Sequence, residues 1–187
     1  MIFASNNKGK LNEIKSIFFE EEILSLKEAK IDIDVEEDQD SFYGNALKKA
    51  KEIYKLAKVP VIADDSGLCI NTFDGWPGVL THRFAGEEAT DAERNEILVE
   101  KLKNEKDKSA QVVCNLVYYD GTNIVVGEGI INGQISEPRG INGFGFDPIF
   151  ELENNLTLAE LSSEEKNKCS ARYLAAKDLK NKLKELK

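Results

Sequence analysis

The sequence predicts an α/β protein with a mixed central sheet and flanking helices. Short apolar runs typical of strands alternate with longer segments in which apolar residues recur at helical spacing. No internal repeat, low-complexity tract or Pro/Gly/Ser linker interrupts this alternation. We therefore expect a single domain over residues 1–187, with two lobes around an active-site cleft.

The first elements follow from the N-terminal pattern. The apolar run Ile2–Ala4 predicts a strand, the polar segment Ser5–Lys10 a loop, and the spacing from Leu11 to Phe18 a helix. The alternation in Ile31–Val35 predicts a half-buried strand.

A long helix and a further strand come next. Apolar residues share one face over residues 42–57, and Asp40 or Ser41 precedes them as a helix cap. Val59–Ala63 reads as a strand, and Pro60 fits its start because a missing N–H is tolerated there.

Caps and turns delimit the second half of the chain. Capping boxes at Thr90–Glu93 and Ser162–Glu165 each predict the start of a helix. The β-rich runs Ala110–Tyr119 and Asn123–Ile135 flank a turn signal and predict a long hairpin. The Leu-spaced, charged segment Tyr173–Leu186 predicts a terminal amphipathic helix.

Composition excludes several classes of function. Thirty-four acidic against 25 basic residues give a net charge of −9, which argues against a groove for nucleic acid. No apolar run approaches the roughly 20 residues that a membrane span needs, and no signal peptide is visible. Three scattered cysteines and one histidine argue against a disulfide framework or a zinc site. We therefore expect a cytoplasmic protein.

Two segments have the chemistry of a phosphate and metal site. Ser5–Lys10 places two lysines and polar side chains at a helix start, which favours an anion, although a solvated loop would look the same. Asp64 and Asp65 follow a predicted strand, where a divalent cation would offset their repulsion. The alternative is a turn in which Gly67 has a positive φ. Glu36–Asp38 could add a further metal ligand beside Asp65.

Two further segments could recognise a flat ligand. Gly140–Pro148 combines three glycines with Phe144, whose ring can stack on a base. The alternative is a tight hairpin with its aromatic side chains in the core. Lys166 and Ser170–Arg172 add cations near the last helix, where Arg172 could donate to a carbonyl or a phosphate.

These segments, in this order, resemble the inosine/xanthosine triphosphate pyrophosphatases, which remove non-standard purine nucleotides. The resemblance covers essentially the whole chain, and six ordered motifs are far more specific than one. The matching segments are Ser5–Lys10, Glu37–Ala46, Ala63–Leu68, Gly75–Gly86, Gly143–Phe150 and Ala159–Lys166.

The resemblance implies Mg²⁺-dependent hydrolysis of ITP, dITP and XTP to the monophosphate and pyrophosphate. It implies Glu37 and Asp65 as metal ligands and Asp65 as the general base, with Glu36 and Asp64 left open as alternatives. The substrate-binding residues that it implies are Ser5, Asn6, Asn7, Lys8, Gly9, Lys10, Ser66, Phe144, Gly145, Phe146, Asp147, Lys166 and Arg172.

Two positions depart from the family pattern. Ala171 replaces the family's usual histidine before Arg172, and His82 replaces its usual alanine. A related pyrophosphatase for pyrimidine or modified nucleotides, or a non-catalytic nucleotide sensor, is therefore kept as an alternative. The family is commonly dimeric, so we expect a homodimer, with Trp76 and Pro77 either at its interface or in local packing.

Overall fold

The computed structural model describes residues 1–86 and 88–186. Glu87 and Lys187, which the predicted domain includes, lie outside the described residues. The chain divides into two compact units. Unit 1 comprises Met1–Ser66, Cys114–Gly129 and Ser170–Lys187, and unit 2 comprises Gly67–Val113 and Ile130–Cys169.

A six-stranded mixed sheet with helices confirms the predicted fold class. Its strand order is β2-β1-β3-β4-β5-β6. β1 runs parallel to β2 and to β3, whereas β5 and β6 are antiparallel. The strands are β1 (Ile2–Phe3), β2 (Leu24–Ser25), β3 (Val61–Ile70), β4 (Ser109–Tyr119), β5 (Ile124–Ile135) and β6 (Phe150–Glu151).

The helices begin close to the predicted caps. They are α1 (Lys8–Ile17), α2 (Phe42–Ala57), α3 (Asp91–Leu102), α4 (Ser163–Cys169) and α5 (Ala171–Glu185), with short 3₁₀ turns at Asn71–Phe73 and Gly78–Leu80. Ser41 caps α2, which decides between the two predicted caps. The predicted boxes are both present, since Thr90 pairs with Glu93 and Ser162 with Glu165.

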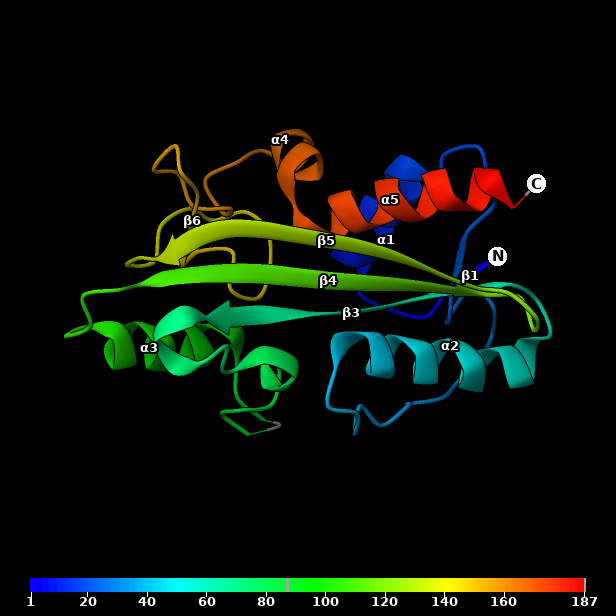
Figure 1. Ribbon diagram of the computed structural model, residues 1–187, viewed down its shortest axis with the longest axis horizontal. Helices are drawn as coiled ribbons and strands as arrows, with labels where there is room; N and C mark the ends of the chain where they lie inside the picture. The colour runs from blue at the N-terminus through cyan, green and yellow to red at the C-terminus, as the bar shows by residue number, and fades with distance from the viewer. Residues whose placement is uncertain (87, 187) are drawn as a thin grey trace. The chain divides into compact units, whose positions relative to one another are not determined.

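Unit 1 is layered around its part of the sheet. Helices α1 and α5 lie side by side over one face, and α2 covers the other (Figure 1). The apolar side of α2 packs on the strands, so Ala46, Ala50 and Ile53 are buried against Val61 and Val117. This packing holds α2 beside the middle of β3.

Unit 1 also contains an unusually close contact between α5 and β5. A Cβ atom on Gly129 would stand 2.0 Å from the Ala171 carbonyl oxygen, and one on Gly127 would stand 2.1 Å from that of Ala175. Only glycine fits such an approach. These two glycines therefore set the position of the start of α5, where Arg172 lies.

Two strand predictions need correction. β3 does not end at Ala63 but continues through Asp64–Gly67 to Ile70, so the alternative of a turn at Gly67 is also wrong. Ile31–Val35 belongs to no strand. Ile31 and Ile33 pack partly on the core, which explains why apolar residues alternate with exposed ones. The segment is not a strand because it does not pair with a neighbouring strand.

Unit 2 contains α3, α4 and β6 with the parts of β3, β4 and β5 that belong to it. Its core includes Leu98 and Leu102 of α3 together with Ile149, Phe150 and Leu158. In the described part of the chain, no helix combines the length and hydropathy needed to cross a membrane.

Candidate active site

The two adjacent acids of β3 have different surroundings. Asp64 is 1% exposed, and its Oδ2 lies 3.0 Å from Lys10 Nζ and 3.1 Å from Arg172 Nη2. Burial alone would raise the pKa of Asp64, but Lys10, Arg172 and Lys49 hold that pKa well below its usual range. Asp64 is therefore an ionised partner of buried cations and is unsuited to accept a proton.

Arg172 is the centre of a buried network in unit 1. Besides Asp64, its Nη1 donates to Glu13 Oε2 at 2.9 Å and its Nη2 donates to Ser66 Oγ at 3.0 Å. The sequence predicted that Arg172 donates to a carbonyl or a phosphate of the substrate. Its hydrogen bonds go instead to side chains from α1 and β3, which is the arrangement of a residue that positions the acids.

Asp65 is held by neutral donors. Its Oδ2 accepts from Asn45 Nδ2 and its Oδ1 from the Ser66 backbone N–H, each at 2.9 Å. Burial raises the pKa of Asp65 to about 6; Glu37 and Asp64 add to the rise, while Lys49 and Asn45 oppose it. Of the two adjacent acids, Asp65 is thus the one that can change its protonation state near neutral pH.

Glu37 lies near Asp65, whereas Glu36 is exposed. The Lys49 ammonium donates to Glu37, and the negative charges of Asp64, Glu37 and Asp65 outweigh burial and raise the pKa of Lys49. The positive charge of Lys49 offsets the repulsion among the nearby carboxylates of Asp64, Glu37 and Asp65. This arrangement favours Glu37 over Glu36 as the acid that acts with Asp65.

The Ser5–Lys10 segment joins β1 to α1, as predicted. Asn7 caps the helix by accepting from the Lys10 N–H, and Asn6 Oδ1 accepts from the Lys27 N–H at 2.9 Å. The first turn of α1 contains no acidic residue, and Lys8 is exposed. The helix start therefore presents positive charge, although the Lys10 ammonium is paired with Asp64.

The donor set fits Mg²⁺ of the kind that binds with its substrate. Glu37 and Asp65 supply two carboxylates, which is the number that Mg²⁺ commonly takes alongside phosphate oxygens and water. Within residues 1–86 and 88–186, no group of three or more His, Cys, Asp or Glu side chains could hold a metal ion alone. A cation here would take its remaining ligands from phosphate oxygens and water.

In unit 2 three of the predicted base-binding residues come together. Lys166 Nζ donates to Asp147 Oδ2 at 2.6 Å and lies 4.1 Å from the centre of the Phe144 ring. Asp147 Oδ2 also accepts from the Phe144 backbone N–H at 2.7 Å. Phe146 is half-buried and packs against Phe150 at 6.5 Å between ring centres.

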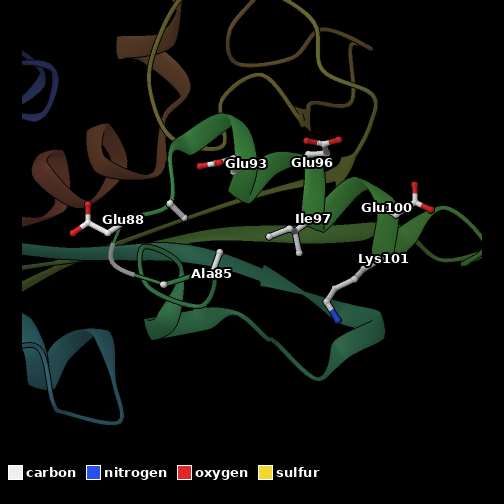
Figure 2. A pocket seen from close by; sticks show the side chains of 9 residues that line it. Ala85, Glu88, Glu93, Glu96, Ile97, Glu100 and Lys101 are labelled. Atoms are coloured by element: carbon white, nitrogen blue, oxygen red, sulfur yellow. The ribbon is translucent and has the colours of Figure 1, made fainter.

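A hollow of about 960 Å³ in unit 2 does not suit a triphosphate. Figure 2 shows Glu88, Glu93, Glu96 and Glu100 around it, with Lys101 the labelled cation. Four carboxylates would repel a ligand with about four negative charges. The hollow is therefore not the anion site.

Sequence reasoning missed Asn45, Lys49 and Glu13. Asn45 and Lys49 are four residues apart on α2, so they share the helix face that is turned to β3. The spacing of these two residues is visible in the sequence, but it does not show that this face of α2 turns toward Asp65. Nothing local marks Glu13, because Arg172 lies 159 residues away.

The fold and these contacts define an α/β protein whose buried acids and lysines suit reactions at phosphate groups. A family model matches residues 1–182, and the chain belongs to the Ham1 family. The dITP/XTP pyrophosphatase of Clostridium perfringens is 46% identical over 196 residues, covering 98% of this chain and 96% of that protein. That of Clostridium tetani is 41% identical over 192 residues, with the same coverage.

Solved structures agree with this assignment. The Ham1 protein of Staphylococcus aureus has a TM-score of 0.90 and 38% identity, and the match covers 100% of this chain and 98% of that one. A HAM1 protein from Coxiella burnetii also has a TM-score of 0.90, with 37% identity and 98% of each chain covered.

Proposed function

We propose that this protein hydrolyses ITP, dITP and XTP to the monophosphate and pyrophosphate. The main support for this proposal is the difference between the two adjacent acids of β3. Lys10 and Arg172 pair with Asp64, whereas Asp65 lies near Glu37 and has a pKa of about 6. The names of its relatives, dITP/XTP pyrophosphatases at 41–46% identity, support the same reaction and substrates.

The triphosphate is held at the start of α1. Lys8 and the free N–H groups of the first turn supply positive charge, and Ser5 and Asn6 supply polar side chains. The Lys10 N–H donates to Asn7, so Lys10 contributes the charge that it shares with Asp64. Ser66, which accepts from Arg172, lies next to the reacting acid and contacts the substrate in this proposal.

Glu37 and Asp65 would hold Mg²⁺ together with phosphate oxygens of the substrate. The cation, when bound, supplies positive charge that stabilises the negative charge developing on the phosphate oxygens. Lys49 balances the same two carboxylates and keeps Glu37 directed toward Asp65.

Asp65 acts as the general base. Its ionised carboxylate takes a proton from water as the water oxygen bonds to the α-phosphorus, and the bond from that phosphorus to the bridging oxygen breaks. Pyrophosphate leaves, and the monophosphate keeps the new oxygen. Asn45 and the Ser66 N–H hold the carboxylate in orientation during this step.

The base is recognised in unit 2 by Phe144 through Asp147 with Lys166. The Phe144 ring offers a stacking face, and the Lys166 ammonium is a donor. Hypoxanthine and xanthine present an oxygen acceptor at C6, where adenine presents an amino donor. A donor facing that amino group would be left unpaired, which disfavours ATP.

A substrate panel with pyrophosphate detection tests the proposal. ITP, dITP and XTP should release pyrophosphate with Mg²⁺ and not without it, whereas ATP, GTP and the pyrimidine triphosphates should react far more slowly. A preference for pyrimidine or other modified bases would favour the related-enzyme alternative. ITP binding without turnover would favour a sensor.

We also propose a cytoplasmic homodimer. Cys69, Cys114 and Cys169 are free thiols, which suits a reducing compartment. Trp76 packs on Phe73 and Phe84 within unit 2, which favours local packing over a role at an interface. Light scattering coupled to gel filtration measures the oligomeric state directly.

A further inference from the structure

The base-recognition loop comprises residues 143–147. Two side chains of α3 form hydrogen bonds with the main chain of Gly145 in this loop. The Gly145 N–H donates to Asp91 Oδ2 at 2.9 Å, and the Gly145 carbonyl accepts from Asn95 Nδ2 at 2.9 Å. Asn95 is 6% exposed, so water has little access to the hydrogen bond between its amide and Gly145. Two residues one helical turn apart therefore fix the main chain next to Phe144.

The loop depends on these hydrogen bonds because its glycines allow many backbone conformations. Gly143 and Gly145 flank Phe144 and both have positive φ, at 83° and 64°. Asp147 binds the Phe144 N–H from within the loop. Without α3, the only described hydrogen bonds to the main chain of Phe144 and Gly145 would come from the loop itself.

We propose that Asn95, assisted by Asp91, is a positioning residue for base recognition. It keeps the Phe144 ring in the orientation that stacks on the purine, and it touches neither the phosphates nor the reacting atoms. The inference rests on the proposed function, because it assigns Phe144 to the base. Loss of Asn95 should weaken ligands that carry a base and spare those that do not.

The test compares Asn95→Ala with the wild-type protein. The KM for ITP should rise about tenfold and kcat should change less than threefold, as expected for one lost hydrogen bond that orders the binding loop. Product inhibition by IMP should weaken about tenfold. Inhibition by inorganic tripolyphosphate, which has no base, should stay unchanged.

The control is Lys101→Gln on the same helix. Lys101 is exposed and lines the acidic hollow (Figure 2). This variant should retain wild-type constants for all three ligands. If Asn95→Ala is poorly folded by thermal melting, Asp91→Ala removes the other bond to Gly145 and should give the same split between IMP and tripolyphosphate.

Two results would overturn the inference alone: unchanged constants for ITP and IMP in a folded variant, or equal weakening of IMP and tripolyphosphate. Both assume that the wild-type protein hydrolyses ITP. A wild-type protein that releases no pyrophosphate from ITP would overturn the proposed function and this inference together.

Discussion

Arg172 donates two hydrogen bonds to one oxygen of Asp64, from Nε at 3.2 Å and from Nη2 at 3.1 Å, across 108 residues of sequence. The pair joins the start of α5 to the middle of β3. Two adjacent carboxyl groups can lie inside one strand because the Arg172 guanidinium neutralises the Asp64 carboxylate. Asp65 is thereby left as the acid that can act in chemistry.

Arg172→Ala should destabilise the protein. Asp64 and Glu13 are both buried and would lose their shared cation, a change that typically costs about 3–5 kcal/mol. Urea denaturation measures the free energy of unfolding. The resemblance implied that Arg172 binds the substrate, whereas its contacts predict mainly a loss of stability.

Arg139→Ala is the control for that loss. Arg139 also pairs with two acids, Glu151 and Glu160, but its side chain is 37% exposed. Water can replace those contacts, so the loss should be markedly smaller. Equal losses in the two variants would mean that the Arg172 network is no more important than a surface pair.

Asp64→Asn should destabilise the protein in a pH-dependent way. Because the pKa of Asp64 in the folded protein lies below its ordinary value of 3.8, ionised Asp64 stabilises the fold fully above about pH 4. That stabilisation declines as the pH falls toward the lower folded pKa. The difference in unfolding free energy should be about 3 kcal/mol at pH 7 and smaller at pH 3.

Urea titrations of both proteins at the two pH values measure this difference. The comparison removes the contribution of carboxyl groups that are distant from Asp64. Asp65 is the exception, because the charge of Asp64 raises its pKa. A gap that stays constant, or widens on acidification, is inconsistent with the lowered pKa.

Asn45→Leu should reduce kcat about tenfold with little change in KM. Asn45 is fully buried, donates to Asp65, and accepts from the Gln39 N–H at 2.9 Å, which fixes which end of the amide faces the acid. Leucine keeps the volume but frees the carboxylate to rotate. Steady-state kinetics with ITP measure both constants.

The control is Asn115→Leu, which replaces another buried asparagine of unit 1 that bonds to Glu128. It should lower stability without a specific loss of kcat. If both variants keep wild-type kcat, the hydrogen bond from Asn45 does not orient the base.

The sequence was sufficient where structure depends on neighbours in the chain. Ser41 and Thr90 cap their helices as expected, because a cap needs only the next few residues. Glu37 and Asp65 lie near each other, and their role as metal ligands stays a prediction. Apolar spacing, caps and turn signals together predicted most of the strands and helices, although they did not predict β2.

Long-range contacts account for what was missed. Adjacent Asp64 and Asp65 suggested the end of a strand, yet β3 continues because Lys10 and Arg172 approach from α1 and α5. Arg172 was assigned to the substrate because no local pattern reveals Glu13 or Asp64 as its partners. Burial of charge depends on tertiary partners that a single sequence does not display.

The two acids should titrate differently in the metal-free protein. Carboxyl ¹³C NMR with EDTA present should show Asp65 titrating at about pH 6 while Asp64 stays ionised below pH 4. Added Mg²⁺ should lower the Asp65 midpoint, since a bound cation favours the carboxylate. Both groups titrating together near pH 4 would remove the distinction between them.

The most direct test of the whole account is pyrophosphate release from ITP by wild-type protein and by Asp65→Asn, with Mg²⁺ at pH 8. The variant keeps the shape of the side chain and a hydrogen-bond acceptor for the Ser66 N–H. It loses the acceptor for Asn45, and it cannot take a proton. We predict that the wild-type protein yields IMP and pyrophosphate, and that kcat falls at least about 100-fold in a variant that circular dichroism shows to be folded. Near-wild-type turnover by Asp65→Asn, or release of orthophosphate by the wild-type protein, would contradict the account.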